Sequence, residues 1–202
     1  MKWEDISIKQ YQDLCKEIDE DYADDLERSI GILSTLTGKS IAYYTDEMPI
    51  NDLKARLKGL EFIKQTPPKP KLHSVIRVGK KRYRFNLNMR IISAGQYIDL
   101  TELVKSKDKI NDNLHIILGL LCEEINWLGF KKKTEVHDRA NYLLNNMKMP
   151  YVFALSGFFL LSYQRLIRST NDYLELEMVK MRKRTREVVD LALSNIGDGI
   201  TR

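Results

Sequence analysis

Three prolines fall within the segment QTPPKPK, residues 65–71. A proline has no backbone N–H to donate, and it disfavours the helical conformation in the residue before it. A helix therefore cannot continue through this segment, which we interpret as a linker or hinge. It separates a helical N-terminal part from a part with predicted β-structure, and this constrains the fold more than any other feature of the sequence.

Residues 1–65 have the apolar periodicity of three helices. The first two are predicted in KQYQDLCKEI and YADDLERSIGILSTLTG, and the third in INDLKARLKGLEFIK. In the second, apolar side chains recur at helical spacing at Leu26, Ile30, Leu33 and Leu36, and Gly38 is placed to cap its C-terminus. We expect these helices to pack on one another.

The predicted β-structure follows the prolines. In LHSVIRVGKKRYRFNLN, residues 72–88, apolar and polar side chains alternate on both sides of GKK, which is typical of a hairpin with a short glycine-containing turn. Further helices are predicted near 93–105, across 112–130 and across 134–148. Pro150 is placed to open another, and a final helix is expected from Ser169 to about Asn195.

These elements predict a mainly α protein, a helical bundle with one small inserted β-hairpin and a long basic C-terminal helix. We divide it into an N-terminal helical unit at 1–65, a Pro-rich linker and β-hairpin at 66–90, a second helical unit at 91–168 and the basic helix at 169–202.

Two helix starts resemble each other. ISIKQYQDL at 6–14 and ISAGQYIDL at 92–100 are identical at six of nine positions, and DLERSIGIL at 25–33 can be laid on NLHIILGLL at 113–121. In both starts a serine is placed as N-cap, with a glutamine three residues later to complete a capping box. This internal similarity indicates either a duplicated helical unit or two independent uses of the same capping residues.

Charge is distributed unevenly along the chain. Residues 1–65 contain 9 Lys and Arg against 14 Asp and Glu, a balance of −5, whereas residues 66–202 contain 24 against 14, a balance of +10. This polarity suits an acidic partner, nucleic acid or head-to-tail self-assembly, and solvated surface charge is the simpler alternative.

Cations concentrate at two places that are candidate nucleic-acid contacts. The hairpin has Lys80, Lys81, Arg82 and Arg84, and the last helix has Arg182, Lys183, Arg184 and Arg186. Phosphates would contact these cations while an interleaved aromatic, Tyr83 or Phe85, stacks on a base. The alternative is that strand alternation places the charges in solvent and the aromatics underneath.

The last helix also has an apolar stripe flanked by this charge. Its members, spaced for one helical face, are Leu174, Met178, Met181 and Val188. Such a stripe is a candidate partner-binding surface, in another protein or in a second copy of the chain, and packing within its own domain is the alternative.

Catalytic motifs are missing from the sequence. No Gly-rich phosphate loop, nucleophile elbow or zincin motif occurs, and the three histidines lack ligand spacing. We therefore predict a non-enzymatic protein with no catalytic residues, no metal site and no cofactor. The longest apolar run, Met149–Tyr163, is interrupted by Ser156 and Gly157, so no membrane association is expected, and the two cysteines fit a reduced, cytoplasmic setting.

Several stretches together resemble a known group of proteins. ISIKQYQDL, KPKLHSVIRVGKKRYRFNLN, ISAGQYIDLTEL and NLHIILGLL, in this order over about residues 3–165, are similar to tailed-bacteriophage proteins described as tail assembly chaperone-like or virion-associated, including those of crAss-like phages of gut Bacteroidetes. The basic last helix is not part of this resemblance.

The resemblance implies a role in phage morphogenesis. Such a protein would bind a tape-measure protein or another tail component in the host bacterial cytoplasm during assembly. The alternative is a structural or cargo protein retained in the virion, where its basic hairpin and last helix contact DNA or neighbouring virion proteins. The resemblance implies no set of ligand-binding residues.

Overall fold

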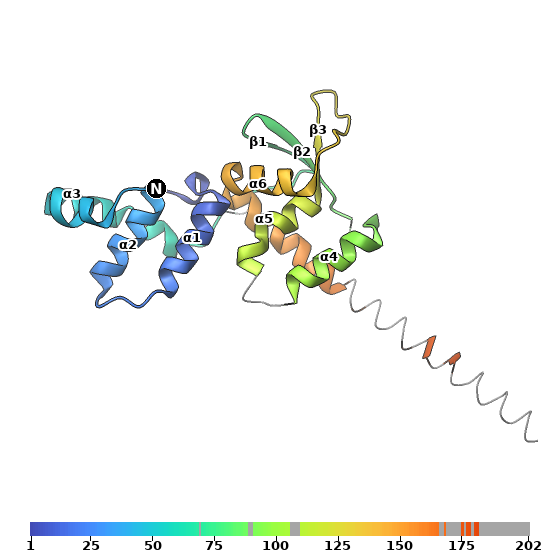
Figure 1. Ribbon diagram of the computed structural model, residues 1–202, viewed down its shortest axis with the longest axis horizontal. Coiled ribbons are helices and arrows are strands. Elements are labelled where there is room, and N and C mark those ends of the chain that lie inside the picture. Colours follow the sequence, from blue (N-terminus) through green and yellow to red (C-terminus); the bar gives the residue numbers. More distant parts are fainter. Residues whose placement is uncertain are drawn as a thin grey trace, which may run out of the picture. The chain divides into compact units, whose positions relative to one another are not determined.

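The protein is mainly helical with a small antiparallel sheet, as predicted (Figure 1). Its structure is a computed structural model that describes residues 1–68, 70–88, 91–105 and 110–165, together with 168, 175, 177, 178, 180 and 181. The chain divides into two compact units, Met1–Phe159 and Leu160–Arg202. The first unit includes all of the expected segments 1–65 and 66–90 and most of 91–168.

The three predicted N-terminal helices are present. They are α1 (Ile8–Asp19), α2 (Asp25–Thr37) and α3 (Ile50–Lys58), and α1 packs against α2. Gly38 caps α2 in the left-handed conformation with φ of 71°, as its position predicted. The third helix is shorter than expected, because a separate 3-10 turn, Glu61–Lys64, follows it.

Both predicted capping boxes form, and each glutamine also makes a tertiary contact. Ser7 caps α1 and Ser93 caps α4 (Ala94–Val104), with Gln10 and Gln96 as their partners. The Gln10 Nε2 donates to the carbonyl of Leu36 in α2 at 3.0 Å. In the same way, the Gln96 Nε2 donates at 3.0 Å to the carbonyl of Leu120, which ends α5 (Ile110–Leu120). The glutamine of each capping box thus links the start of its own helix to the end of the next helix by a hydrogen bond.

The two glycines laid on each other in the sequence have different surroundings. A Cβ at Gly119 would lie 3.0 Å from the Cβ of Ala140 in α6 (Val136–Asn146), so Gly119 admits a neighbouring helix. A Cβ at Gly31 would instead meet the side chains of Glu17 and Tyr22. The capping device is therefore repeated, whereas the packing role of the glycine is not.

The predicted hairpin is confirmed, and a third strand extends it into a sheet. Strands β1 (Val75–Val78), β2 (Lys81–Phe85) and β3 (Cys122–Ile125) are antiparallel in the order β1-β2-β3. The prediction of one helix across 112–130 was wrong beyond Leu120. The helix ends there because CEEI can pair with the second edge of β2. The Leu121 carbonyl accepts a hydrogen bond from the Asn86 N–H at 2.8 Å.

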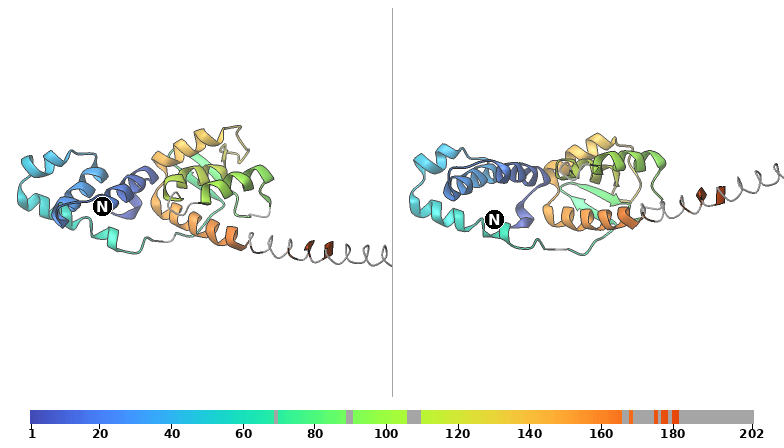
Figure 2. Two further views of the ribbon diagram at one scale, coloured as in Figure 1. Left: turned by 60° about the horizontal axis from the view of Figure 1, so that its bottom comes forward. Right: turned by 90° about the horizontal axis from the view of Figure 1, so that it is seen from below.

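Helices α5 and α6 pack closely, and a further helix covers residues 149–165 (Figure 2). Pro150 lies in its first turn, as predicted. The main hydrophobic core takes buried side chains from the N-terminal helices, the sheet and the later helices, with Trp3, Leu14, Tyr83, Leu118 and Leu143 among them. The segments on both sides of the Pro-rich linker thus share one core.

Most of the predicted C-terminal helix lies outside the described residues. Those that are described between 175 and 181 are helical. Among the described helices, none is long and apolar enough to cross a membrane.

Candidate functional site

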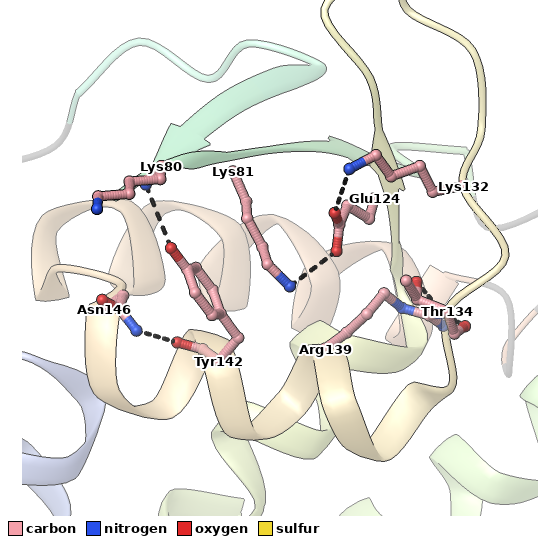
Figure 3. Close-up of polar contacts among 8 residues, drawn as sticks. All are labelled: Lys80, Lys81, Glu124, Lys132, Thr134, Arg139, Tyr142 and Asn146. Carbon is pink, nitrogen blue, oxygen red and sulfur yellow. Dashed lines mark hydrogen bonds and ion pairs between the residues drawn. The ribbon is translucent and has the colours of Figure 1, made fainter.

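The candidate site lies at the end of the sheet, where the β1–β2 turn meets β3 and α6 (Figure 3). Strand register sorts its side chains into two rows. Ile76, Tyr83 and Glu124 are cross-strand neighbours on the face that is buried, and Arg77, Arg82 and Ile125 are neighbours on the opposite face. The charged hairpin residues therefore leave the strands on both faces of the sheet.

Glu124 is the buried acidic group of the site, with 4% of its surface exposed. Its two carboxylate oxygens accept hydrogen bonds from the ammonium groups of Lys81 at 3.0 Å and Lys132 at 3.1 Å. Burial by itself would raise the pKa of Glu124, but the two lysines outweigh burial and hold this pKa below its usual range. The carboxylate stays charged and is fully occupied by its partners.

Helix α6 supports this ion-pair cluster from below, as Figure 3 shows. The Lys81 ammonium lies 4.5 Å from the centre of the Tyr142 ring, and the Tyr142 hydroxyl accepts from the Lys80 backbone N–H at 3.2 Å. Arg139 donates to the carbonyls of Gly119, at 3.1 Å, and of Thr134. These contacts fix the hairpin turn and the segment before α6 to one helix.

Replacing Glu124 with glutamine is expected to reduce stability at neutral pH by about 1–2 kcal/mol. The amide oxygen can accept from only one of the two lysines, without the negative charge, and the amide NH2 group cannot accept from the other. The pKa of Glu124 is lower in the folded state than in the unfolded chain. Its contribution is therefore present above the unfolded value of about 4.3 and is lost as the pH falls through the folded value. Urea unfolding at pH 7 and pH 3 should show the two proteins converging in acid; a constant difference would contradict this role.

Residues 126–130 form a tight loop after β3 that exposes three large apolar side chains. Trp127, Leu128 and Phe130 are 78%, 58% and 67% exposed. The loop backbone is nevertheless held in place. The Asn126 N–H donates to the Phe130 carbonyl at 2.9 Å, and Gly129 turns the chain with φ of 88°.

Two arginines of β2 attach this loop to the sheet. Arg84 donates to the Gly129 carbonyl at 2.9 Å, and Arg82 donates to the Trp127 carbonyl at 3.4 Å. The two arginines bond to backbone carbonyls of the loop and not to the Trp127 side chain. The loop backbone is therefore held to β2 while Trp127 is exposed. An exposed tryptophan on ordered backbone is typical of a binding surface.

A cleft of about 400 Å³ opens between the hairpin turn and this loop. We call it the basic cleft; it is lined by Arg77, Lys80, Lys81, Arg82, Glu124, Ile125, Asn126, Trp127 and Lys132. Five of these side chains are cationic, and the single carboxylate, Glu124, is already paired with two of them. The cleft therefore presents an excess of positive charge beside an exposed aromatic ring.

The residues predicted to contact nucleic acid have different positions in the structure. Lys80 and Arg82 line the basic cleft, Lys81 also lines it but turns inward to Glu124, and Arg84 lies outside it and supports the loop. The other four, Arg182, Lys183, Arg184 and Arg186, lie outside the described residues.

The idea that a hairpin aromatic stacks on a base was wrong. Tyr83 and Phe85 are buried, because strand alternation turns them toward the core, which is the alternative reading of the pattern. Burial also raises the pKa of Tyr83. The exposed aromatic residue that lines the basic cleft is Trp127, which lies in the loop after β3 and not in the helix predicted across 112–130. The Asn and Gly around it in INWLGF are turn residues that indicate a loop.

A second cleft, of about 540 Å³, lies beside α2 and α3. We call it the α2–α3 cleft; its lining is apolar at Met1, Leu33, Tyr43, Met48, Pro49, Ala55 and Leu60 and polar at Glu47, Asp52 and Arg56, with Gly59 between them. Beneath it a small separate core of Ile30, Leu33, Tyr44 and Leu53 gives the cleft a packed floor.

Of the predicted partner-binding stripe, Met178 and Met181 are described. Both are helical, with 47% and 57% of their surface exposed. Leu174 and Val188 lie outside the described residues. Within the described part of the chain, no group of three or more His, Cys, Asp or Glu side chains is placed to hold a metal ion.

Comparisons with protein-family models, with curated proteins and with solved structures find no match to this chain.

Proposed function

We propose that the chain is a non-enzymatic bacteriophage morphogenesis protein, a tail assembly chaperone-like factor that binds a tape-measure or other tail component in the host cytoplasm. The proposal rests on the resemblance of residues 3–165 to such phage proteins. Mass spectrometry of purified particles would distinguish a factor that leaves after assembly from a protein retained in the virion, since only the latter would be present at many copies.

The observation that supports partner binding is the α2–α3 cleft. Its apolar lining lies at the surface, and the half-buried Tyr43 ring packs edge to face on the buried Tyr44 ring with centroids 5.2 Å apart. An open cleft with both apolar and polar side chains in its lining, on a packed floor, accepts the side chains of a partner helix or loop. Glu47 and Asp52 line the cleft against one cation, Arg56, and this excess of one negative charge favours a partner segment that carries a basic residue next to apolar ones.

Filling the cleft is expected to abolish this binding. Ala55 is exposed on α3 and lines the cleft, so Ala55→Arg places a long charged side chain in it without disturbing the core. When the protein is co-expressed with the tail proteins encoded beside it, we expect this change to reduce recovery of the partner at least about tenfold, as for a blocked interface centre.

Ala42→Arg is the matched control, because Ala42 is also exposed but does not line the cleft. It should leave recovery of the partner unchanged. If no tail protein is recovered with the unaltered chain, the proposed function is wrong. If one is recovered equally with both variants, the partner binds elsewhere.

A further inference from the structure

We infer that the basic cleft binds a single-stranded nucleic acid, with phosphates on its cations and one base stacked on Trp127. This goes beyond the proposed function, because it concerns a different surface and a different class of ligand. It also differs from the contact predicted from the hairpin alone, since the stacking ring comes from the loop after β3.

The first support is an uncompensated charge. Five cations and one carboxylate line the basic cleft, an excess of four positive charges. Arg77 and Arg82 are direct cross-strand partners, and like charges in this position destabilise a sheet. On β3, the cross-strand partner of Arg84 is the carboxylate residue Glu123, whereas the cross-strand partner of Arg82 is the uncharged Ile125. No cross-strand partner of Arg82 therefore offsets its charge. A polyanion would supply the missing negative charge.

The second support is the position of Trp127. Trp127 is 78% exposed and lines the same cleft as Lys80 and Arg82. The loop beneath it is tied down by the bonds from Arg82 and Arg84, so the ring is presented without a large cost of ordering on binding. An aromatic ring within a cationic groove is the arrangement that holds single strands, because phosphates follow the charge and bases stack on the ring.

The same features favour a single strand over other polyanions. An acidic protein segment would neutralise the cations, but it has no planar groups that need an exposed indole. In a duplex the bases are already stacked on one another, so Trp127 could reach them only by opening the helix. Single-stranded DNA and RNA share the phosphate and base chemistry that the cleft recognises.

The test is binding of a fluorescently labelled 15-nucleotide oligothymidylate to the full chain, followed by anisotropy at several salt concentrations. We expect affinity that falls steeply with salt, and a loss of about tenfold for Trp127→Ala, the effect of removing one stacking platform. Trp127→Phe keeps an aromatic face and should lose no more than about threefold. Lys80→Ala should weaken binding and reduce the salt slope by about one.

Lys54→Ala is the matched control, because it removes an exposed cation from α3, away from the basic cleft. It should leave the affinity unchanged. Any binding by the basic segment at 182–186 is common to all variants, so the comparison among them isolates the cleft.

Intrinsic fluorescence locates the bound strand. The chain has two tryptophans, and Trp3 is only 7% exposed. The unlabelled oligonucleotide should quench the unaltered protein, whereas Trp127→Phe, which retains Trp3 alone, should show no quenching.

Three results would each overturn the inference. They are binding that both Trp127→Ala and Lys80→Ala leave unchanged, equal affinity for a duplex of the same length, and tighter binding of poly-glutamate than of the oligonucleotide. Partner recovery through the α2–α3 cleft requires neither residue, so this inference and the proposed function can fail independently.

Discussion

Replacing Trp3 with alanine is expected to lower the free energy of unfolding by about 4 kcal/mol, near the upper range for truncating a buried aromatic residue. The Trp3 ring packs edge to face on Phe62 and Phe153, with centroids 5.2 and 5.4 Å apart. Its indole N–H donates to the Gln65 carbonyl at 3.2 Å, next to the Pro-rich linker. The change removes this hydrogen bond and leaves a cavity between three segments far apart in the sequence.

The other tryptophan provides the control for this prediction. Trp127 is 78% exposed, so Trp127→Ala should change stability by no more than about 0.5 kcal/mol. Urea unfolding followed by circular dichroism measures both variants against the unaltered chain. Equal losses for the two, or a loss below about 1 kcal/mol for Trp3→Ala, would show that Trp3 does not anchor the core.

Gly119→Val is the second change with a large expected effect. A Cβ at this position would lie 3.0 Å from the Ala140 Cβ and 3.1 Å from the Ala140 backbone nitrogen, so α6 would have to move. Overpacking of this kind costs about 3 kcal/mol. Because Arg139 of α6 donates to the Gly119 carbonyl, the movement would also disturb the support of the basic cleft.

Gly157→Val is the matched control, because Gly157 is an exposed helical residue with nothing within 4 Å of an added Cβ. Valine is a better helix former than glycine, so stability should stay the same or rise by up to about 0.5 kcal/mol. Thermal unfolding of both variants gives the comparison. If Gly119→Val unfolds at the same temperature as Gly157→Val, the α5–α6 interface is not as closely packed as its geometry indicates.

Local features of the sequence were sufficient for most of the secondary structure. Helical periodicity placed α1, α2 and α3, the serine and glutamine pairs placed the starts of α1 and α4, and Gly38 placed the end of α2. These features act between residues a few positions apart, through hydrogen bonds and steric preferences that do not depend on the rest of the chain. The hairpin was predictable for the same reason, since its turn and its alternation are local.

The candidate site was less predictable, because it depends on contacts between distant segments. CEEI becomes β3 only when β2 is beside it to be paired, and by its apolar pattern alone it continues a helix. The direction of Lys81 toward Glu124, 43 residues away, depends on the same pairing.

The sequence by itself thus determined most of the helices, the hairpin and the polarity of charge. Only the tertiary structure decided that Tyr83 is buried while Trp127 is exposed, and that Arg77, Arg82 and Trp127 border one cleft. The physical reason is that capping, turns and periodicity depend on interactions between residues close in the sequence. A binding surface is formed instead by strand pairing and by packing between segments that are far apart in the sequence.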